Sequence, residues 1–264
     1  MNEGTPPADI DNTPDLERRF GGLRRLYGDA AYLRLRAGRI AVVGLGGVGS
    51  WAVEALARSG VAALTLIDLD HIAESNINRQ VQALGSTVGM AKAQALMQRA
   101  HDIHPACRVT AIEQFVDADN WPALLPEPVD AVIDACDHVR AKLALAVWAR
   151  ATGVRLIVVG AAGGKQLPQA VAVDDLAEVT HDPLLASLRQ RLRKEHAAPR
   201  SGRIGLTCVY SREAVHRPTQ AAGDDGVHDS SLNCHGYGSS VGVTATFGMV
   251  AASEALRCVA ASPR

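Results

Sequence analysis

Residues 40–50 read Ile40-Ala41-Val42-Val43-Gly44-Leu45-Gly46-Gly47-Val48-Gly49-Ser50. Four apolar residues run directly into glycines spaced G-x-G-x-x-G, and apolar residues at helical spacing follow over residues 51–59. A strand, a glycine turn and a helix N-terminus form a cradle for phosphate, because backbone N–H groups and the helix dipole both favour an anion there. This stretch predicts a Rossmann-like nucleotide site. Its cofactor-binding glycines are Gly44, Gly46, Gly47 and Gly49.

Two acidic residues follow the next predicted strand. Residues 63–67 are apolar apart from Thr65 and lead into Asp68 and, two residues later, Asp70. An acidic side chain about 20 residues beyond the glycines can accept a hydrogen bond from a ribose hydroxyl. A tight turn without a ligand would explain the glycines alone, but the acid after the next strand favours nucleotide binding. Asp68 and Asp70 therefore join the predicted site.

Strand and helix patterns alternate through the next hundred residues. Further strands are predicted at residues 107–115, 129–133 and 155–159, and helices at 92–100 and 142–151. This alternation is typical of an α/β fold with a doubly wound, mostly parallel sheet.

Composition and charge fit one large domain. The chain has 264 residues, 47% of them hydrophobic, and a formal net charge of -1, so nucleic acid would bind only at a local basic patch. We predict a disordered tail (1–15) and a nucleotide-binding core with an N-terminal helical arm (16–165). A C-terminal α/β extension (166–264), with a mobile loop at 217–236, is predicted to complete the same domain.

Signals for export or membrane insertion are weak. No charged-then-apolar leader pattern opens the chain, and its five cysteines are widely spread without a Cys-x-x-Cys pair, which favours a reducing cytoplasm. Residues 237–261 are apolar enough to suggest a membrane helix, but Glu254 would lie within the span. We expect residues 239–261 to form a buried helix, with no stable membrane insertion, and the protein to be cytoplasmic.

A second group of polar residues follows the ends of the predicted strands. In chain order the group is Asn76, Arg79, Gln80, Lys92, Asp134 and Asp137. Arg79 and Lys92 suit phosphate oxygens, where their charge would stabilise a pentavalent phosphorus, and we expect both side chains to be exposed. Asp137 suits a metal ion. Surface ion pairs are the alternative, but they would not explain why these groups all follow strand ends on one edge.

This arrangement resembles the ubiquitin-activating-enzyme-like superfamily, which includes the ThiF and MoeB adenylyltransferases. The matching residues are Gly44-Leu45-Gly46-Gly47-Val48-Gly49, Asp68-x-Asp70, Asn76-x-x-Arg79-Gln80, Val88-Gly89-x-x-Lys92 and Asp134-x-x-Asp137. The resemblance implies that ATP binds with Mg2+ and that a substrate carboxylate attacks the α-phosphate, giving an acyl-adenylate and pyrophosphate. It implies that Asp68 holds the ribose, that Asn76, Arg79 and Lys92 hold the phosphates, and that Asp137 holds the metal. Arg79, Lys92 and Asp137 are then the candidate catalytic residues.

Within this superfamily the chain is most similar to the tRNA threonylcarbamoyladenosine dehydratase branch. The similarity extends to Arg19-Phe20-Gly21-Gly22, Asp137-His138-Val139-Arg140-Ala141-Lys142, Gly160-Ala161-Ala162-Gly163-Gly164 and Val243-Thr244-Ala245-Thr246-Phe247-Gly248. It implies ATP-dependent cyclisation, with loss of water, of threonylcarbamoyladenosine beside the anticodon of tRNA. It also implies a homodimer and, as a further partner, a sulfurtransferase-type protein. The glycine turn at 160–164 either approaches the substrate or binds a monovalent cation.

Other functions fit part of the pattern. An adenylyltransferase for a ubiquitin-like sulfur-carrier protein is one, but those enzymes usually show Asp-Asn where this chain has Asp137-His138 and often carry paired Cys-x-x-Cys motifs. They also offer an arginine across the subunit boundary where this chain has Gly22, and Arg25 is the candidate replacement. A nicotinamide-dependent oxidoreductase or a non-catalytic nucleotide-binding scaffold would leave the cations Arg79 and Lys92 unexplained.

A basic stretch near the C-terminal third has two interpretations. Six Lys and Arg residues fall between residues 189 and 203. They form either a solvated helix face or a patch for RNA phosphates.

Overall fold

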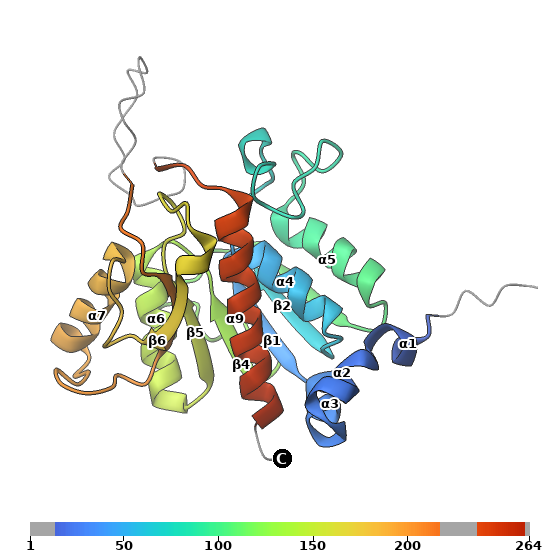
Figure 1. Ribbon diagram of the computed structural model, residues 1–264, viewed down its shortest axis with the longest axis horizontal. Helices are drawn as coiled ribbons and strands as arrows, with labels where there is room; N and C mark the ends of the chain where they lie inside the picture. The colour runs from blue at the N-terminus through green and yellow to red at the C-terminus, as the bar shows by residue number, and fades with distance from the viewer. Residues whose placement is uncertain (1–13, 217–236, 262–264) are drawn as a thin grey trace, which may run out of the picture.

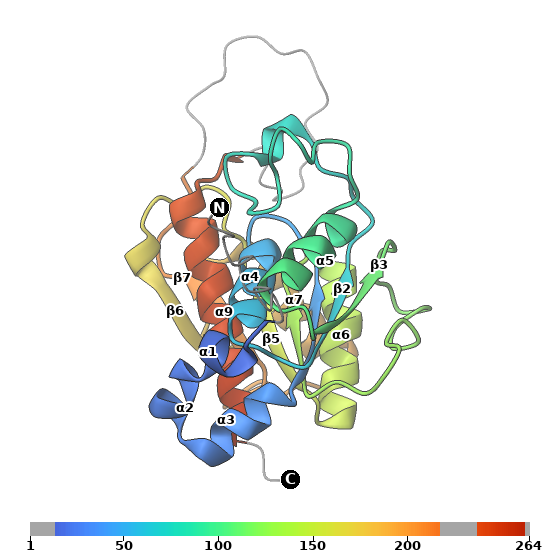
Figure 2. The same ribbon diagram turned by 90° about the vertical axis from the view of Figure 1, so that its right-hand side faces the viewer.

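A seven-stranded sheet forms the centre of the molecule (Figures 1 and 2). The structure is a computed structural model that describes residues 14–216 and 237–261, so most of the predicted tail and the whole predicted loop 217–236 lie outside the described residues. The strand order is β3-β2-β1-β4-β5-β7-β6, and all neighbours are parallel except the edge strand β6, which is antiparallel to β7. The strands are β1 (Arg39–Val43), β2 (Ala63–Ile67), β3 (Arg108–Ile112), β4 (Ala131–Asp134), β5 (Arg155–Val159), β6 (Val171–Asp175) and β7 (Thr207–Ser211).

Helices cover both faces of this sheet, as predicted for a doubly wound fold. α4, α5 and α9 pack on one face together with α3, and α6 and α7 pack on the other (Figure 1). The helices are α1 (Leu16–Phe20), α2 (Gly22–Tyr27), α3 (Asp29–Arg36), α4 (Gly49–Arg58), α5 (Lys92–Ile103), α6 (Val139–Thr152), α7 (Pro183–Glu195) and α9 (Val241–Ala261). The described residues also contain two 3-10 turns, η1 (Glu74–Asn76) and η2 (Pro168–Ala170).

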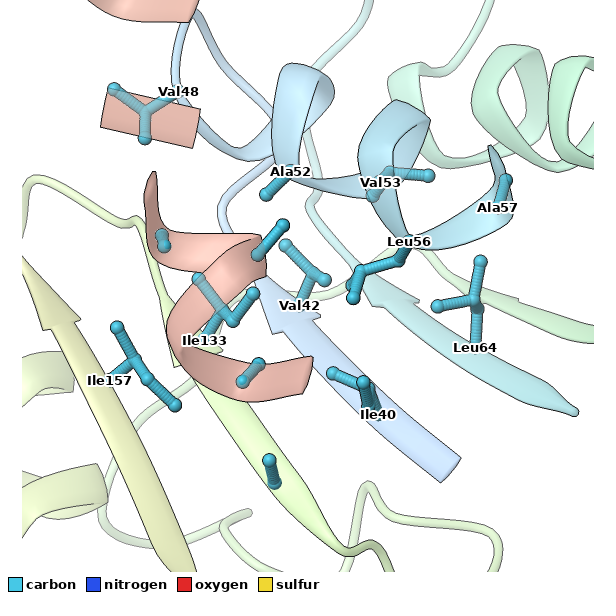
Figure 3. Close-up of a cluster of buried hydrophobic side chains, with 14 of the residues drawn as sticks. Ile40, Val42, Val48, Ala52, Val53, Leu56, Ala57, Leu64, Ile133 and Ile157 are labelled. Atoms are coloured by element: carbon cyan, nitrogen blue, oxygen red, sulfur yellow. The ribbon is translucent and has the colours of Figure 1, made fainter. Parts of the chain in front are cut away.

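Residues of the central strands alternate between two hydrophobic cores. Ile40 and Val42 of β1 point to the side of α4 and α9, whereas Ala41 and Val43 point to the side of α6 and α7. Figure 3 shows Ile40 and Val42 meeting Leu56 of α4 in the first core. Because both faces of the strand are covered, every residue of the run is apolar, and this explains why the sequence pattern was a continuous apolar stretch.

The long apolar helix α9 packs across the sheet. Among the described residues it is the one helix whose length and mean hydropathy, 1.2 over its most apolar window, would allow it to cross a membrane, yet 56% of that window is buried in the molecule. Its Gly248 approaches α4 so closely that a Cβ would lie 2.5 Å from the carbonyl oxygen of Val48. The predicted buried helix is confirmed, with its start at Val241, and packing in the core accounts for its apolar character.

The N-terminal arm, which the sequence predicted to be helical, forms three short helices. Gly21 and Gly28 separate them, and Gly28 has a φ of 78°, which favours glycine. Arg36 stacks on the ring of Phe20 at 4.6 Å and reaches Nε2 of His104 at 3.1 Å. The arm is thereby attached to the C-terminal end of α5.

Strand β7 was not predicted. It lies between β5, to which it is parallel, and β6, to which it is antiparallel. The five residues of β7 pair with strands that are distant in sequence on one side and with β6 on the other. Through β6, β7 and α9 the C-terminal part of the chain belongs to the same sheet and cores as the N-terminal part.

Candidate active site

The loop between β1 and α4 accepts only glycine at two positions. Gly44 has a φ of 84°, and a Cβ on it would lie 2.6 Å from the backbone nitrogen of Cys136. A Cβ on Gly49, the first residue of α4, would lie 1.8 Å from the carbonyl oxygen of Gly44. The loop therefore closes against the end of β4 and leaves the N-terminus of α4 at the carboxyl edge of the sheet, where the helix dipole favours an anion.

Asp68 is fixed beside this loop by backbone hydrogen bonds. Its Oδ2 accepts from the N–H of Leu45 at 2.6 Å, and its Oδ1 accepts from the N–H of Asp70 at 2.8 Å. Burial raises the pKa of Asp68, and the positive charge of Lys92 opposes this rise. The carboxylate joins the end of β2 to the glycine loop, which is the position expected of a ribose-binding acid.

Lys92 and Asp70 form an ion pair at the start of α5. Nζ of Lys92 lies 2.7 Å from Oδ2 of Asp70, and the two side chains are 7% and 55% exposed. The expectation that Lys92 is exposed is wrong, because its side chain is buried at the start of α5. Since Asp70 stays half-exposed, an anion at this edge can share or replace it as the partner of Lys92.

Arg79 is also largely buried, at 8% exposure, so the expectation of an exposed side chain is wrong here too. Its Nη1 donates to the carbonyl oxygen of Ser75 at 2.5 Å and to Oδ1 of Asn78 at 2.9 Å. Its stem runs along the glycine loop, where a Cβ on Gly47 would lie 3.4 Å from Cγ of Arg79. Its Nε is buried without an acceptor among the described residues, and a phosphate oxygen would supply one.

Three amide side chains support the segment between β2 and α5, which rises above the sheet (Figure 2). Oδ1 of Asn76 accepts from the N–H of Ala73 at 3.0 Å and closes the turn η1. Nε2 of Gln82 donates to the carbonyl oxygen of Leu45 at 3.0 Å and to Oε1 of Gln80 at 3.1 Å. Asn76 and Gln80 are thus buried supports of the loop, and their contact with the nucleotide stays a prediction. Gln82 was not singled out, because a buried amide leaves no pattern in the sequence.

Asp134 lies beneath the site and has no exposed surface. Its Oδ1 accepts from Nζ of Lys142 at 3.1 Å and from Sγ of Cys136 at 2.8 Å. Burial raises the pKa of Asp134, and the positive charge of Lys142 opposes this rise. In this geometry Asp134 fixes the loop after β4, and its contact with the cofactor stays a prediction. The buried Lys142 was not predicted as its partner, although a lysine in an otherwise apolar helix was a usable signal.

Asp137 is the exposed acid after β4. Its Oδ1 lies 2.8 Å from Nδ1 of His138, and its side chain is 53% exposed. Within the part of the chain that the structure describes, no three His, Cys, Asp or Glu side chains are grouped to hold a metal by themselves. A nucleotide-bound Mg2+ needs only one or two carboxylates, since phosphates and water supply its other ligands. Asp137 fits that donor set.

Comparison with protein families places almost the whole chain in one of them. The model described as the ThiF family matches residues 21–264. The chain belongs to the ThiF family.

Relatives in the ThiF family resemble the chain over nearly its full length. The chain is similar to tRNA threonylcarbamoyladenosine dehydratase of Escherichia coli (strain K12), with 43% identity over 248 residues, which covers 91% of this chain and 92% of that protein. The corresponding protein of Haemophilus influenzae is 39% identical, with 96% of each chain covered. A crystal structure of the E. coli protein in complex with ATP is similar with a TM-score of 0.84 and 42% identity, covering 93% of this chain and 96% of that one. The family and the fold inferred from the sequence motifs are confirmed.

The adenylyltransferases of the family match a smaller part of the chain. The molybdopterin-synthase adenylyltransferase of E. coli is 36% identical over 123 residues, which is 47% of this chain. These enzymes are therefore more distant relatives than the dehydratases.

Proposed function

We propose that this chain dehydrates threonylcarbamoyladenosine beside the anticodon of tRNA, in an ATP-dependent cyclisation that proceeds through carboxyl adenylation. The observation that carries the proposal is the 43% identity to the E. coli dehydratase over 91% of this chain and 92% of that protein. The match to a sulfur-carrier-type adenylyltransferase covers only 47% of the chain. The proposed tRNA substrate agrees with a cytoplasmic protein.

ATP binds at the carboxyl edge between β1 and β2. The related E. coli protein has been crystallised with ATP and with AMP, which supports this assignment. In this chain the phosphates lie at the N-terminus of α4, and Asp68 binds the ribose. Lys92 and the Nε of Arg79 meet the α-phosphate, where their charges stabilise the pentavalent phosphorus.

Asp137 is the residue that would hold a Mg2+ accompanying ATP. The ion neutralises part of the phosphate charge when bound. The exposure of Asp137 and its position after β4 support this role.

The chemistry requires no nucleophile from the protein. A carboxylate oxygen of the threonyl group forms a bond to the α-phosphorus, and the bond to pyrophosphate breaks. An internal nitrogen or oxygen of the same nucleoside then attacks the acyl carbon, loses its proton, and AMP leaves with the former carboxylate oxygen. Cys136 is a poor nucleophile here, because burial raises the pKa of its thiol well above the ordinary value.

The test is incubation of the protein with ATP, Mg2+ and tRNA that carries threonylcarbamoyladenosine, followed by nucleoside mass analysis. We expect a nucleoside lighter by one water, with AMP released. AMP formed only in the presence of a small protein with a Gly-Gly tail would favour the sulfur-carrier adenylyltransferase instead.

The tRNA binds along the C-terminal half of α7. A surface hollow of about 530 Å³ there is lined by Ala186, Arg189, Gln190, Arg193, Lys194 and Arg200. Arg189 is oriented by bonds from its Nη1 to two backbone carbonyls. We expect the double variant Lys194→Ala with Arg200→Ala to bind tRNA more weakly. The slope of the logarithm of tRNA affinity against the logarithm of salt concentration should fall by the equivalent of about two phosphate contacts, and ATP binding should be unchanged.

The chain forms a homodimer through its N-terminal arm. Leu26 and Leu33 of the arm are 73% and 58% exposed, and Arg25 on the same arm is exposed and available to a neighbouring subunit. A sulfurtransferase-type protein is a further partner by family resemblance. A monomer mass in solution at working concentration would contradict the dimer.

A further inference from the structure

A buried lysine outside the proposed ATP site holds three segments together. Lys165 follows the glycine turn 160–164 at the end of β5 and is 3% exposed. Its Nζ donates to the carbonyl oxygen of His181 at 3.1 Å and to the carbonyl oxygen of Glu213. His181 lies just before α7 and Glu213 just after β7, so one ammonium joins segments that are far apart in the sequence.

The side chain of Glu213 holds the backbone that follows Lys165. Its carboxylate accepts from the N–H of Gln166 at 3.0 Å and from the N–H of Leu167 at 2.9 Å. Each segment therefore binds the other: the lysine side chain binds the backbone of Glu213, and the glutamate side chain binds the backbone after the lysine.

Asp182 holds the other end of the glycine turn. Its Oδ2 accepts from the N–H of Ala161 at 2.8 Å, and a Cβ on Gly160 would lie 2.1 Å from the same oxygen. The turn is thus fixed before Lys165 by Asp182 and after it by Glu213. Burial lowers the pKa of Lys165, and the negative charges of Asp182 and Glu213 oppose this fall.

The acceptors of the Lys165 ammonium are those that proteins use for alkali-metal cations. Backbone carbonyl oxygens replace the hydration shell of K+ in protein sites. His181 has a φ of 57°, which residues other than glycine rarely adopt, and in this conformation its carbonyl accepts from Lys165. A residue stays in such a conformation only where its surroundings hold it there, and the Lys165 ammonium is one of the groups that contact this carbonyl.

We propose that the Lys165 ammonium is a built-in monovalent cation, which holds the 160–164 turn at the carboxyl edge so that no free K+ is needed at this position. The sequence left two interpretations of the turn, substrate placement and binding of a monovalent cation. In the second, the Lys165 ammonium takes the place of the free cation. The role of the turn in placing the substrate rests on the proposed function, whereas the cation site does not.

The test uses two variants of the full chain that differ in the space they leave. Lys165→Ala opens room beside the carbonyl oxygens, whereas Lys165→Met removes the charge and fills the same room. Thermal unfolding is measured in KCl and in choline chloride of equal ionic strength. The wild type is expected to have the same Tm in both salts, and Lys165→Met a Tm lower by about 5 °C in both, because buried carbonyls lose their donor.

In choline chloride the Tm of Lys165→Ala is expected to fall by as much as the Tm of Lys165→Met. In KCl the Tm of Lys165→Ala is expected to recover at least half of this fall. A variant that folds only in KCl counts as the same recovery, and one that folds in neither salt overturns the proposal. The proposal is also overturned if KCl raises the Tm of Lys165→Ala and Lys165→Met equally, or if the Tm of the wild type is higher in KCl than in choline chloride.

The positioning role is tested by kinetics. In choline chloride, kcat of Lys165→Ala for cyclisation is expected to fall about tenfold and to return in KCl, while KM for ATP stays unchanged because ATP binds at β1 and β2. An unchanged kcat contradicts the positioning role. If no cyclisation occurs even in the wild type, the proposed function fails, and the thermal measurement still decides the cation site.

Discussion

Two buried lysines near the carboxyl edge, Lys92 and Lys142, differ in what their acidic partners can do. Lys92 lies 2.7 Å from Asp70, whose side chain is 55% exposed. Lys142 lies 3.1 Å from Asp134, and neither side chain has any exposure. A ligand can reach the first pair but not the second. The exposure of the acid, and not the burial of the lysine, therefore separates a pair suited to binding from one that only stabilises the fold.

The largest effect is expected from breaking the enclosed pair. Lys142→Met leaves the carboxylate of Asp134 without its cation in the core, so the free energy of unfolding should fall by about 3–5 kcal/mol. Urea denaturation measures this loss. The double variant with Asp134→Asn should recover most of it, because no charge then stays buried alone. A loss below about 1 kcal/mol in Lys142→Met would show that the pair is not structural.

The half-exposed pair should behave in the opposite way. Lys92→Met should lower kcat by about 100- to 1,000-fold, because a charge that acts on the transition state is removed. Its free energy of unfolding should change by less than about 1 kcal/mol, since Asp70 can turn to water. Steady-state kinetics and urea denaturation of the same sample measure both quantities. A stability loss equal to that of Lys142→Met would remove the distinction between the two pairs.

His104 is a further buried base, and the charged residues that shift its pKa are both arginines. It stacks on Phe20, and burial together with the charges of Arg36 and Arg19 lowers its pKa to about 4. Because this value lies below that of the unfolded chain, about 6.5, the unfolded state binds more protons at intermediate pH. The free energy of unfolding should therefore fall as the pH decreases from about 6.5 to about 4, by at most about 3 kcal/mol.

The contribution of His104 is measured by denaturation across this pH range. His104→Gln should remove this part of the pH dependence and leave stability at pH 8 less affected. A slope that persists in the variant would assign the acid sensitivity to other groups.

The sequence predicted those strands whose successive residues are all buried in the same kind of apolar environment. Residues 155–159 were predicted as a strand and form β5, because the part of a parallel strand that is covered on both faces, here residues 156–159, is continuously apolar. The helix after the glycines was predicted two residues late, since Gly49 is a poor helix former but begins α4. Strand β7 was missed, because its place depends on pairing with β5 and β6 and not on its own residues.

The sequence predicted that the candidate site residues follow strand ends at one edge of the sheet, but it did not predict the burial of two of them. Gly44, Asp68 and Asp137 follow strand ends, and parallel strands bring those ends to one edge, so their placement could be inferred. The burial of Arg79 and Lys92 depends on contacts with distant segments, such as the bond from Thr244 to the carbonyl oxygen of Arg79. Such contacts leave no spacing pattern in the sequence.

An oxygen-labelling experiment tests the central claim most directly. The tRNA is prepared with threonylcarbamoyladenosine whose carboxylate carries oxygen-18, and the products of a single turnover with ATP are analysed by mass spectrometry. Attack of that carboxylate on the α-phosphorus predicts one labelled oxygen in AMP and one in the cyclised nucleoside. Unlabelled AMP, or label in inorganic phosphate with ADP as the other product, would contradict adenylation at this site.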